Sequence, residues 1–142
     1  MQAEILFDQV SETCHPPEGF AVEEIMSWLK GVAAEEGKSI DHILYVFCDD
    51  SFLLDLNQQY LNHDTLTDII TFPYSDNPIS AEIYISLERV QENAAAYNNG
   101  NYYLELCRVI VHGLLHMCGY NDHNPLEKET MRNKESHYLQ AL

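Results

Sequence analysis

The spacing of apolar residues divides the first half of the chain into short strands and one amphipathic helix. Apolar and polar residues alternate over residues 3–7, which predicts a first short strand. Between residues 20 and 36 apolar side chains recur every three or four positions, which predicts a helix that Gly37 ends. Residues 42–48 are almost continuously apolar, as is typical of a strand covered on both faces. We therefore expect this strand at the centre of a sheet.

The middle of the chain predicts a short helix and two more strands. Residues 50–60 begin with residues that favour a helix N-cap and continue with helical spacing. Residues 67–72 are rich in β-branched and aromatic side chains, and residues 82–85 alternate with a period of two. The intervening segment, residues 73–78, is rich in turn-forming residues and predicts a connector.

Three helices are expected in the last part of the chain, at residues 86–97, 104–118 and about 126–139. Gly119 would end the second of them, because glycine tolerates the left-handed conformation with which many helices stop. The last helix has mixed charges, which are typical of a solvated face with ion pairs between residues four apart. The order of the elements predicts an α+β fold in which helices cover a mixed sheet of about four strands.

Composition and charge narrow the classes of protein that need to be considered. With 46% hydrophobic and 21% charged residues, the chain fits one compact domain, residues 1–142. Seven Lys and Arg against 23 Asp and Glu give a formal net charge of −16, which argues against a broad basic surface and against DNA binding. No apolar run reaches membrane length, and the first residues lack the basic and apolar regions expected of a signal peptide. The four cysteines form no Cys-x-x-Cys pair. We expect a protein of the reducing cytoplasm.

Residues 111–123 carry the clearest chemical signal: Val-His-Gly-Leu-Leu-His-Met-Cys-Gly-Tyr-Asn-Asp-His. Residues four apart on a helix point within about 40° of each other, so His112 and His116 project from one face. A turn after Gly119 could bring His123 back toward them. Three imidazoles on Zn²⁺, with the fourth position open, are typical of a catalytic zinc site. We predict one zinc ion per chain, held by His112, His116 and His123.

Other candidate residues have weaker support. Arg108 lies one turn before His112 on roughly the same helical face, where it could contact a phosphate or pair with a carboxylate. His63 precedes the third strand and could approach the site. Asp68 and Glu82 are candidates for proton acceptors or for partners that orient an imidazole, and the sequence assigns neither of them a catalytic role.

The segment around the histidines resembles the YbeY family of bacterial rRNA maturation factors, whose signature is His-Gly-x-Leu-His-x-x-Gly-Tyr-Asp-His. Residues 56–60, 67–72 and 82–94 look like further blocks of the family in the same order. The resemblance implies a zinc-dependent, single-strand-specific endoribonuclease of late small-subunit rRNA 3′-end maturation and ribosome quality control. It also implies a metalloprotease-like (zincin-like) architecture.

The family pattern places its metal ligands on His112, His116 and His123, and this chain departs from the pattern at two points. One extra residue precedes the last histidine, so that Asp122 occupies the family's spacing. Because an aspartate oxygen also binds Zn²⁺, a site with Asp122 as third ligand is the alternative. Leu61 stands where the family usually has an arginine, and leucine cannot neutralise a phosphate.

The expected chemistry is phosphodiester cleavage. No glutamate follows His112, where zinc peptidases with a His-Glu-x-x-His motif have their general base, and this argues against a peptidase. The simplest attack on phosphorus is by metal-bound hydroxide or by a metal-polarised ribose 2′-OH. The expected partners are rRNA and the small ribosomal subunit, reached through basic ribosomal proteins. The alternative function is a ribosome-assembly binding module with a structural metal and little or no cleavage.

Overall fold

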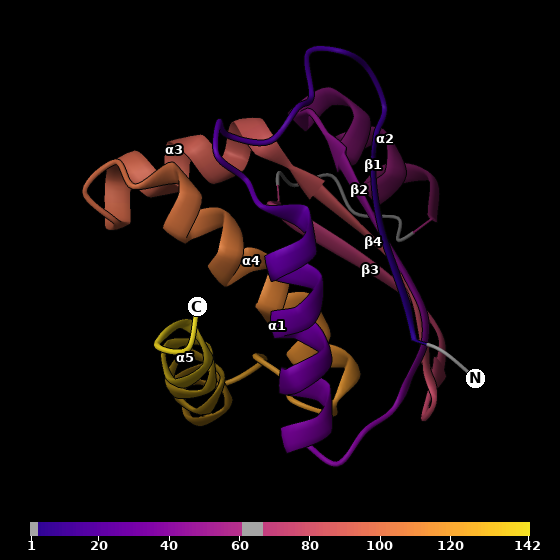
Figure 1. Ribbon diagram of the computed structural model, residues 1–142. Helices are drawn as coiled ribbons and strands as arrows, with labels where there is room; N and C mark the ends of the chain where they lie inside the picture. The colour runs from indigo at the N-terminus through magenta and orange to yellow at the C-terminus, as the bar shows by residue number, and fades with distance from the viewer. Residues whose placement is uncertain (1–2, 61–66) are drawn as a thin grey trace.

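A four-stranded sheet forms the centre of the computed structural model, which describes residues 3–60 and 67–142 (Figure 1). The strands are β1 (Glu4–Gln9), β2 (Ile40–Cys48), β3 (Ile69–Asp76) and β4 (Ile79–Ser86). Their order in the sheet is β1-β2-β4-β3; β1, β2 and β4 run parallel, and β3 pairs antiparallel with β4. The mixed sheet is therefore confirmed, and the apolar strand β2 is central.

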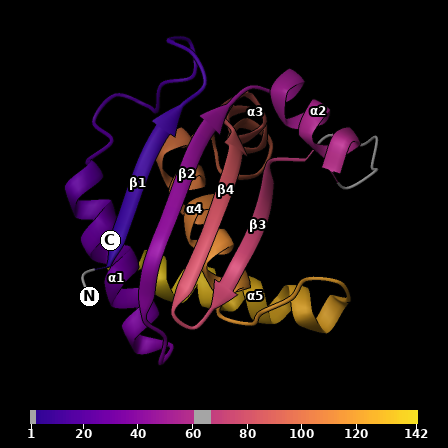
Figure 2. The ribbon, with the colours of Figure 1, turned by 90° about the vertical axis from the view of Figure 1, so that its right-hand side faces the viewer.

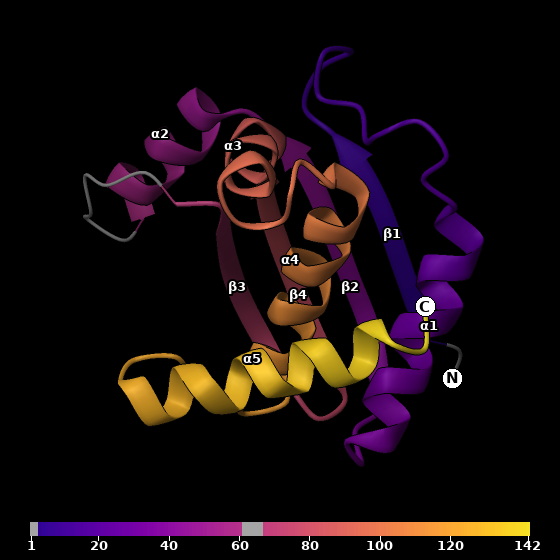
Figure 3. The ribbon, with the colours of Figure 1, turned by 90° about the vertical axis from the view of Figure 1, so that its left-hand side faces the viewer.

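The helices of the described residues gather mainly on one face of this sheet. They are α1 (Val22–Glu35), α2 (Asp50–Tyr60), α3 (Leu87–Tyr97), α4 (Tyr102–Met117) and α5 (Pro125–Leu139). Figure 3 shows α4 lying over the sheet roughly along the strands, with α5 crossing in front of it and α1 beside them, whereas Figure 2 shows the opposite face, with α2 near β3. The predicted α+β architecture is confirmed. No helix in the described part of the chain has both the length and the apolar character of a membrane span.

Helix α4 is held close against the sheet by its apolar side. The hydroxyl of Tyr45 on β2 donates a buried hydrogen bond of 2.9 Å to the carbonyl of Ile110 on α4. A Cβ at Gly113 would lie only 3.1 Å from the Cδ1 atoms of both Ile69 and Ile83, so the absence of a side chain lets α4 approach β3 and β4. This close contact determines where the neighbouring His112 lies relative to the sheet.

The structure corrects one predicted boundary. The segment 73–78 was expected to be a connector, but β3 continues to Asp76 and only the Asn77-Pro78 corner separates it from β4. Proline is tolerated inside β3 because β3 is an edge strand and the pairing register shifts between Pro73 and Ser75. The turn-forming residues of this segment favour a loop. The segment is a strand because it pairs with β4, and the local sequence does not reveal that pairing.

The predicted helix ends agree closely with the structure. Ser86 caps α3 by accepting a hydrogen bond of 3.2 Å from the backbone N–H of Arg89. Asn124 caps α5 in the same way, with 2.8 Å to the N–H of Glu127. Gly119 has φ of 108°, the left-handed conformation expected after α4. The two ends of the connector between α4 and α5 are therefore set by local sequence signals.

Candidate functional site

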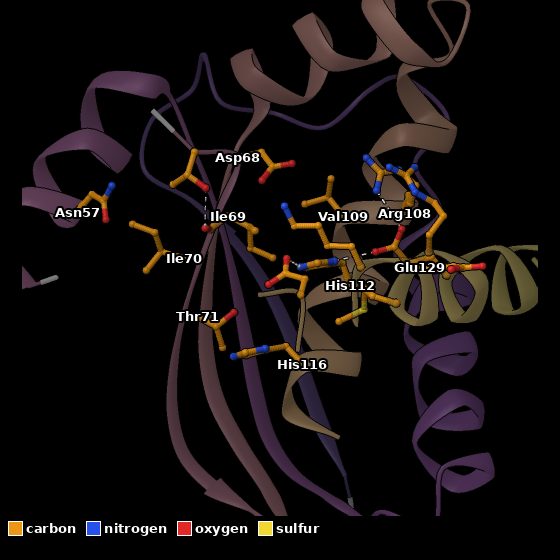
Figure 4. A pocket seen from close by; sticks show the side chains of 16 residues that line it. Asn57, Asp68, Ile69, Ile70, Thr71, Arg108, Val109, His112, His116 and Glu129 are labelled. Atoms are coloured by element: carbon orange, nitrogen blue, oxygen red, sulfur yellow. Dashed lines mark hydrogen bonds and ion pairs between the residues drawn. The ribbon is translucent and has the colours of Figure 1, made fainter. Parts of the chain in front are cut away.

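A cavity of about 820 Å³ lies between the beginning of β3, helix α4 and helix α5 (Figure 4). Helix α4 contributes Arg108, His112 and His116 to its lining, Asp68 comes from the residues just before β3, and Asp122 comes from the connector between α4 and α5. The two histidines, which their helical spacing predicts on one face of α4, both line this cavity.

Both cavity histidines donate one ring N–H to an oxygen of the protein. His112 Nδ1 lies 2.7 Å from Oε2 of Glu135, and His116 Nδ1 lies 3.1 Å from the carbonyl oxygen of Tyr120. A carboxylate and a carbonyl can only accept hydrogen bonds, so each Nδ1 carries the hydrogen. In the neutral rings both Nε2 atoms therefore keep a lone pair, which is the tautomer that a metal ion binds. In Figure 4 dashed lines mark the interactions of the His112 ring.

The Glu135 carboxylate is buried and is held by two hydrogen-bond donors from α4. Its side chain is 2% exposed and accepts hydrogen bonds from His112 and from Arg108, whose NH1 lies 2.9 Å from Oε1. Burial raises the pKa of Glu135, but the hydrogen bonds from His112 and Arg108 outweigh burial and hold the pKa below its ordinary value. The pKa of His112 is raised above its ordinary value by its hydrogen bond to Glu135, although burial opposes this.

Arg108 lines the cavity, but its guanidinium is engaged in ion pairs. Besides Glu135 it contacts Glu105, a neighbour on α4 that is 1% exposed, with 3.1 Å between Nε and Oε1. Of the two roles that the sequence left open for Arg108, the geometry favours pairing with carboxylates over a free contact to phosphate. The pairing connects Arg108 to His112 through Glu135, so Arg108 helps to orient the imidazole.

The two candidates for the third ligand lie in different surroundings. Asp122 lines the cavity, and its Oδ2 is 3.6 Å from Nε2 of His112. His123 is exposed and is absent from the cavity lining that the described residues form; its backbone N–H donates to Oε1 of Glu127 at 3.0 Å. The extra residue in the connector thus brings the aspartate, rather than the following histidine, beside His112.

Two histidines and a carboxylate in the lining are side chains of the kind that bind zinc, but they are not gathered into a metal group. In residues 3–60 and 67–142 no three His, Cys, Asp or Glu side chains are near enough to one another to form a ready metal group. Two ligands at about 2.0–2.2 Å from a tetrahedral Zn²⁺ lie roughly 3.3–3.6 Å apart. The 3.6 Å between His112 and Asp122 matches this separation, and the Nδ1 partners of both histidines match the usual support of zinc-binding imidazoles.

The remaining candidates divide between the cavity and other places. Asp68 lines the cavity, and burial raises its pKa despite the opposing charges of His112 and Arg108. Glu82 lies on β4, where it accepts a hydrogen bond from the Tyr84 hydroxyl at 3.1 Å, and it is not among the described residues that line this cavity. Both remain without an assigned catalytic role. Leu61 and His63 lie outside the described residues.

Glu36, which sequence reasoning missed, ties the connector to two helices. At the end of α1, Glu36 accepts hydrogen bonds from the Tyr120 hydroxyl at 2.7 Å, from Lys134 Nζ at 3.2 Å and from the Tyr138 hydroxyl. Tyr120 stands two residues before Asp122, so Glu36 anchors the turn that carries Asp122. Its partners lie 84 to 102 residues away in sequence, and no local signal indicates the cluster.

The Glu36 cluster predicts a pH-dependent contribution to stability. Burial raises the pKa of Glu36, but the hydrogen bonds from Tyr138, Tyr120 and Lys134 outweigh burial, so the pKa is lowered. A carboxyl with a lowered folded-state pKa stabilises the fold above its unfolded pKa of about 4.3, and this stabilisation is lost as pH falls through the folded pKa. We expect Glu36→Gln to lower the free energy of unfolding at pH 7 by about 1–3 kcal/mol.

Urea unfolding at pH 7 and at pH 3 measures this effect. The difference in the free energy of unfolding between wild type and Glu36→Gln should shrink at pH 3, because pH 3 lies below the unfolded-state pKa, where the stabilisation from the Glu36 charge begins to be lost. Glu35→Gln is the matched control, because Glu35 is the neighbouring glutamate and is 59% exposed. A difference that is equally large at both pH values would show that charge at Glu36 contributes nothing.

Comparison with known proteins identifies relatives over most of the chain. The family model described as Endoribonuclease YbeY matches residues 12–142. A Flavobacterium psychrophilum protein named Endoribonuclease YbeY is 49% identical over 118 residues, covering 82% of this chain and 84% of the relative. Proteins with the same name from Flavobacterium johnsoniae and Parabacteroides distasonis are 50% and 45% identical, and the matches cover 76% and 83% of this chain and 78% and 83% of the relatives.

A solved structure has a similar fold. The solution structure of a Thermotoga maritima protein superposes with a TM-score of 0.67 at 27% sequence identity. The match covers 96% of this chain and 87% of the other. The sheet and its helical layer are therefore an arrangement that an experimentally determined protein shares.

Proposed function

The chain belongs to the YbeY family of endoribonucleases, and from this premise we propose that it is a zinc-dependent endoribonuclease that cleaves single-stranded RNA. The proposed role is late 3′-end maturation of small-subunit rRNA, together with ribosome quality control in the cytoplasm. The observation that carries the proposal is the cavity in which two Nδ1-donating histidines and a carboxylate share one lining.

The proposed metal ligands are His112, His116 and one residue of the connector. The 3.6 Å separation from His112 and the position in the cavity lining support Asp122 as the third ligand. His123, with its exposed side chain, is the alternative. Three protein ligands would leave one position open for substrate or solvent, as in catalytic zinc sites.

The residues of the chain would prepare the site before RNA binds. When bound, zinc would supply a Lewis acid that polarises a phosphoryl oxygen or the attacking hydroxyl group. Glu135 holds His112 in the tautomer whose Nε2 faces Asp122, and Arg108 in turn holds Glu135. Gly113 follows His112, so α4 offers no glutamate in the place of the peptidase general base. This donor set supports phosphodiester cleavage over peptide hydrolysis.

The proposed partners are rRNA and the small ribosomal subunit. With a formal net charge of −16 the chain would be repelled by free RNA over most of its surface. The same charge is complementary to basic ribosomal proteins, which would bring the cavity to its substrate.

Zinc content, measured by elemental analysis on untagged protein, tests the ligand set. We expect about one zinc per chain in the wild type and in His123→Ala, and loss of zinc in Asp122→Ala. Loss in His123→Ala alone would move the third ligand to the histidine. A wild-type protein that binds no zinc would contradict the proposed metal site.

Cleavage assays test the proposed activity. The zinc-loaded wild type should cut single-stranded RNA faster than a duplex of the same sequence, and a chelator should stop the reaction until zinc is restored. Binding to the small subunit without any cleavage would instead support the ribosome-assembly binding module.

A further inference from the structure

Three of the seven cationic side chains of this acidic chain line one cavity. The chain has seven Lys and Arg against 23 Asp and Glu, yet Arg108, Lys128 and Arg132 all line the cavity that holds His112 and His116. On a helix face that is only solvated, cationic residues need not lie near the histidines. These three side chains place positive charge beside the two histidines, where an anion could use it.

Lys128 and Arg132 are cations of the cavity that no carboxylate of the described residues neutralises. Arg108 is paired with Glu105 and Glu135, whereas neither Lys128 nor Arg132 has an ion pair within residues 3–60 and 67–142. The ion pairs between residues four apart that the sequence predicted for α5 are likewise absent from residues 125–139. Both side chains are exposed to solvent at the edge of the cavity and are available to a ligand.

The spacing of the pair suits a linear polyanion. Residues four apart on α5 lie on one face about 6 Å apart along the helix axis, a separation comparable to that between successive phosphates of a nucleic acid strand. A guanidinium can bind phosphate through two parallel hydrogen bonds, and an ammonium acts as a point charge. One strand lying along α5 could therefore contact both residues while its next phosphodiester reaches the histidines.

The carboxylates of the cavity do not cancel this pair. Glu135 is hydrogen-bonded to His112 and Arg108, and Asp122 faces His112. Asp68 also lines the cavity, but it comes from the residues just before β3 and not from α5. Glu129 is the acidic lining residue that α5 places between the two cations in sequence, and it has no ion pair among the described residues. The negative charge of Glu129 should weaken the binding of an anion at Lys128 and Arg132 without abolishing it.

We propose that Lys128 and Arg132 form a phosphate-binding edge that holds successive phosphodiesters of single-stranded RNA beside His112 and His116. This inference rests on the proposed function, because it takes RNA as the substrate. The two side chains position the strand and do not touch the reacting bond. They should therefore influence RNA affinity and KM, while kcat and zinc content stay unchanged.

Binding of a non-cleavable 2′-O-methyl single-stranded RNA to the zinc-loaded protein, measured at several salt concentrations, tests the edge directly. Lys128→Ala and Arg132→Ala should each weaken binding about 5–10-fold at low salt and each reduce the slope of log K against log salt by about 0.7. Lys30→Ala, which removes an exposed lysine of α1 outside the cavity lining, is the matched control and should change affinity less than about 2-fold. Glu129→Gln should tighten binding.

A cleavable RNA of the same sequence separates this inference from the proposed function. Raised KM with unchanged kcat in both cation variants supports the edge. If the wild type cleaves RNA and both cation variants behave like Lys30→Ala, the phosphate-binding edge is overturned and the proposed function is unaffected. Wild type that binds RNA but does not cleave it overturns the proposed function, and the salt slopes still decide the edge. Wild type that neither binds nor cleaves overturns both.

Discussion

Glu135→Ala is expected to lower the free energy of unfolding by about 3 kcal/mol, because it removes a carboxylate that is 2% exposed and pairs with Arg108 and His112. Glu105 would remain as a partner of Arg108, so the loss should not exceed that of one buried ion-pair partner. Urea unfolding measures the change. Glu129→Ala, which removes an exposed glutamate of the same helix, is the control and should be nearly neutral for stability.

The same residue, Glu135, should also affect zinc binding. Without the acceptor at Nδ1, His112 is free to rotate and to adopt the other tautomer, and loss of such a supporting partner lowers metal affinity about 10–100-fold. Glu135→Gln keeps the size of the side chain and an oxygen that can accept from Nδ1, so it is the control that should retain most of the zinc affinity. Unchanged zinc affinity in a folded Glu135→Ala protein would contradict the orienting role of Glu135.

His112→Ala and His116→Ala are expected to have the largest effect on activity. Each variant should lose its zinc ion, and cleavage of single-stranded RNA should fall by on the order of 10³-fold or more, since a Lewis acid contributes several kcal/mol to the transition state. Both rings lie at the cavity and not in the apolar core, so the far-ultraviolet circular dichroism spectrum should stay that of the wild type.

His137→Ala serves as the control for these variants. His137 is exposed, lies near the end of α5, and is not among the described residues that line the cavity. It should keep zinc and activity. Full cleavage by a zinc-free but folded His112→Ala protein would contradict metal-assisted catalysis. Unchanged binding of this variant to the small subunit would separate docking from chemistry.

Features that depend on residues close in sequence are predictable from the sequence alone. The projection of His112 and His116 from one face follows from helix geometry alone. The start of α3 next to Ser86 and the left-handed Gly119 are equally local. The apolar run of β2 predicted a central strand because a strand covered on both faces has no polar side to show.

Features that depend on distant parts of the chain required the tertiary structure. The mixed charges of α5 predict only a solvated face. The sequence near Lys128 and Arg132 does not indicate that these residues share a cavity with the histidines. The extension of β3 through Pro73 depends on the position of the strand at the sheet edge. The choice between Asp122 and His123 likewise turns on how the connector folds back over α4.

The amino-acid sequence by itself therefore determined the elements, the fold class and the pair of histidines, because the periods of helices and strands are visible over a few residues. Only the tertiary structure decided which side chains surround that pair. Glu135 reaches His112 across 23 residues, and Glu36 reaches Tyr120 across 84. Such contacts arise from the packing of α1, α4 and α5, and pairing over these separations leaves no periodic trace in the sequence.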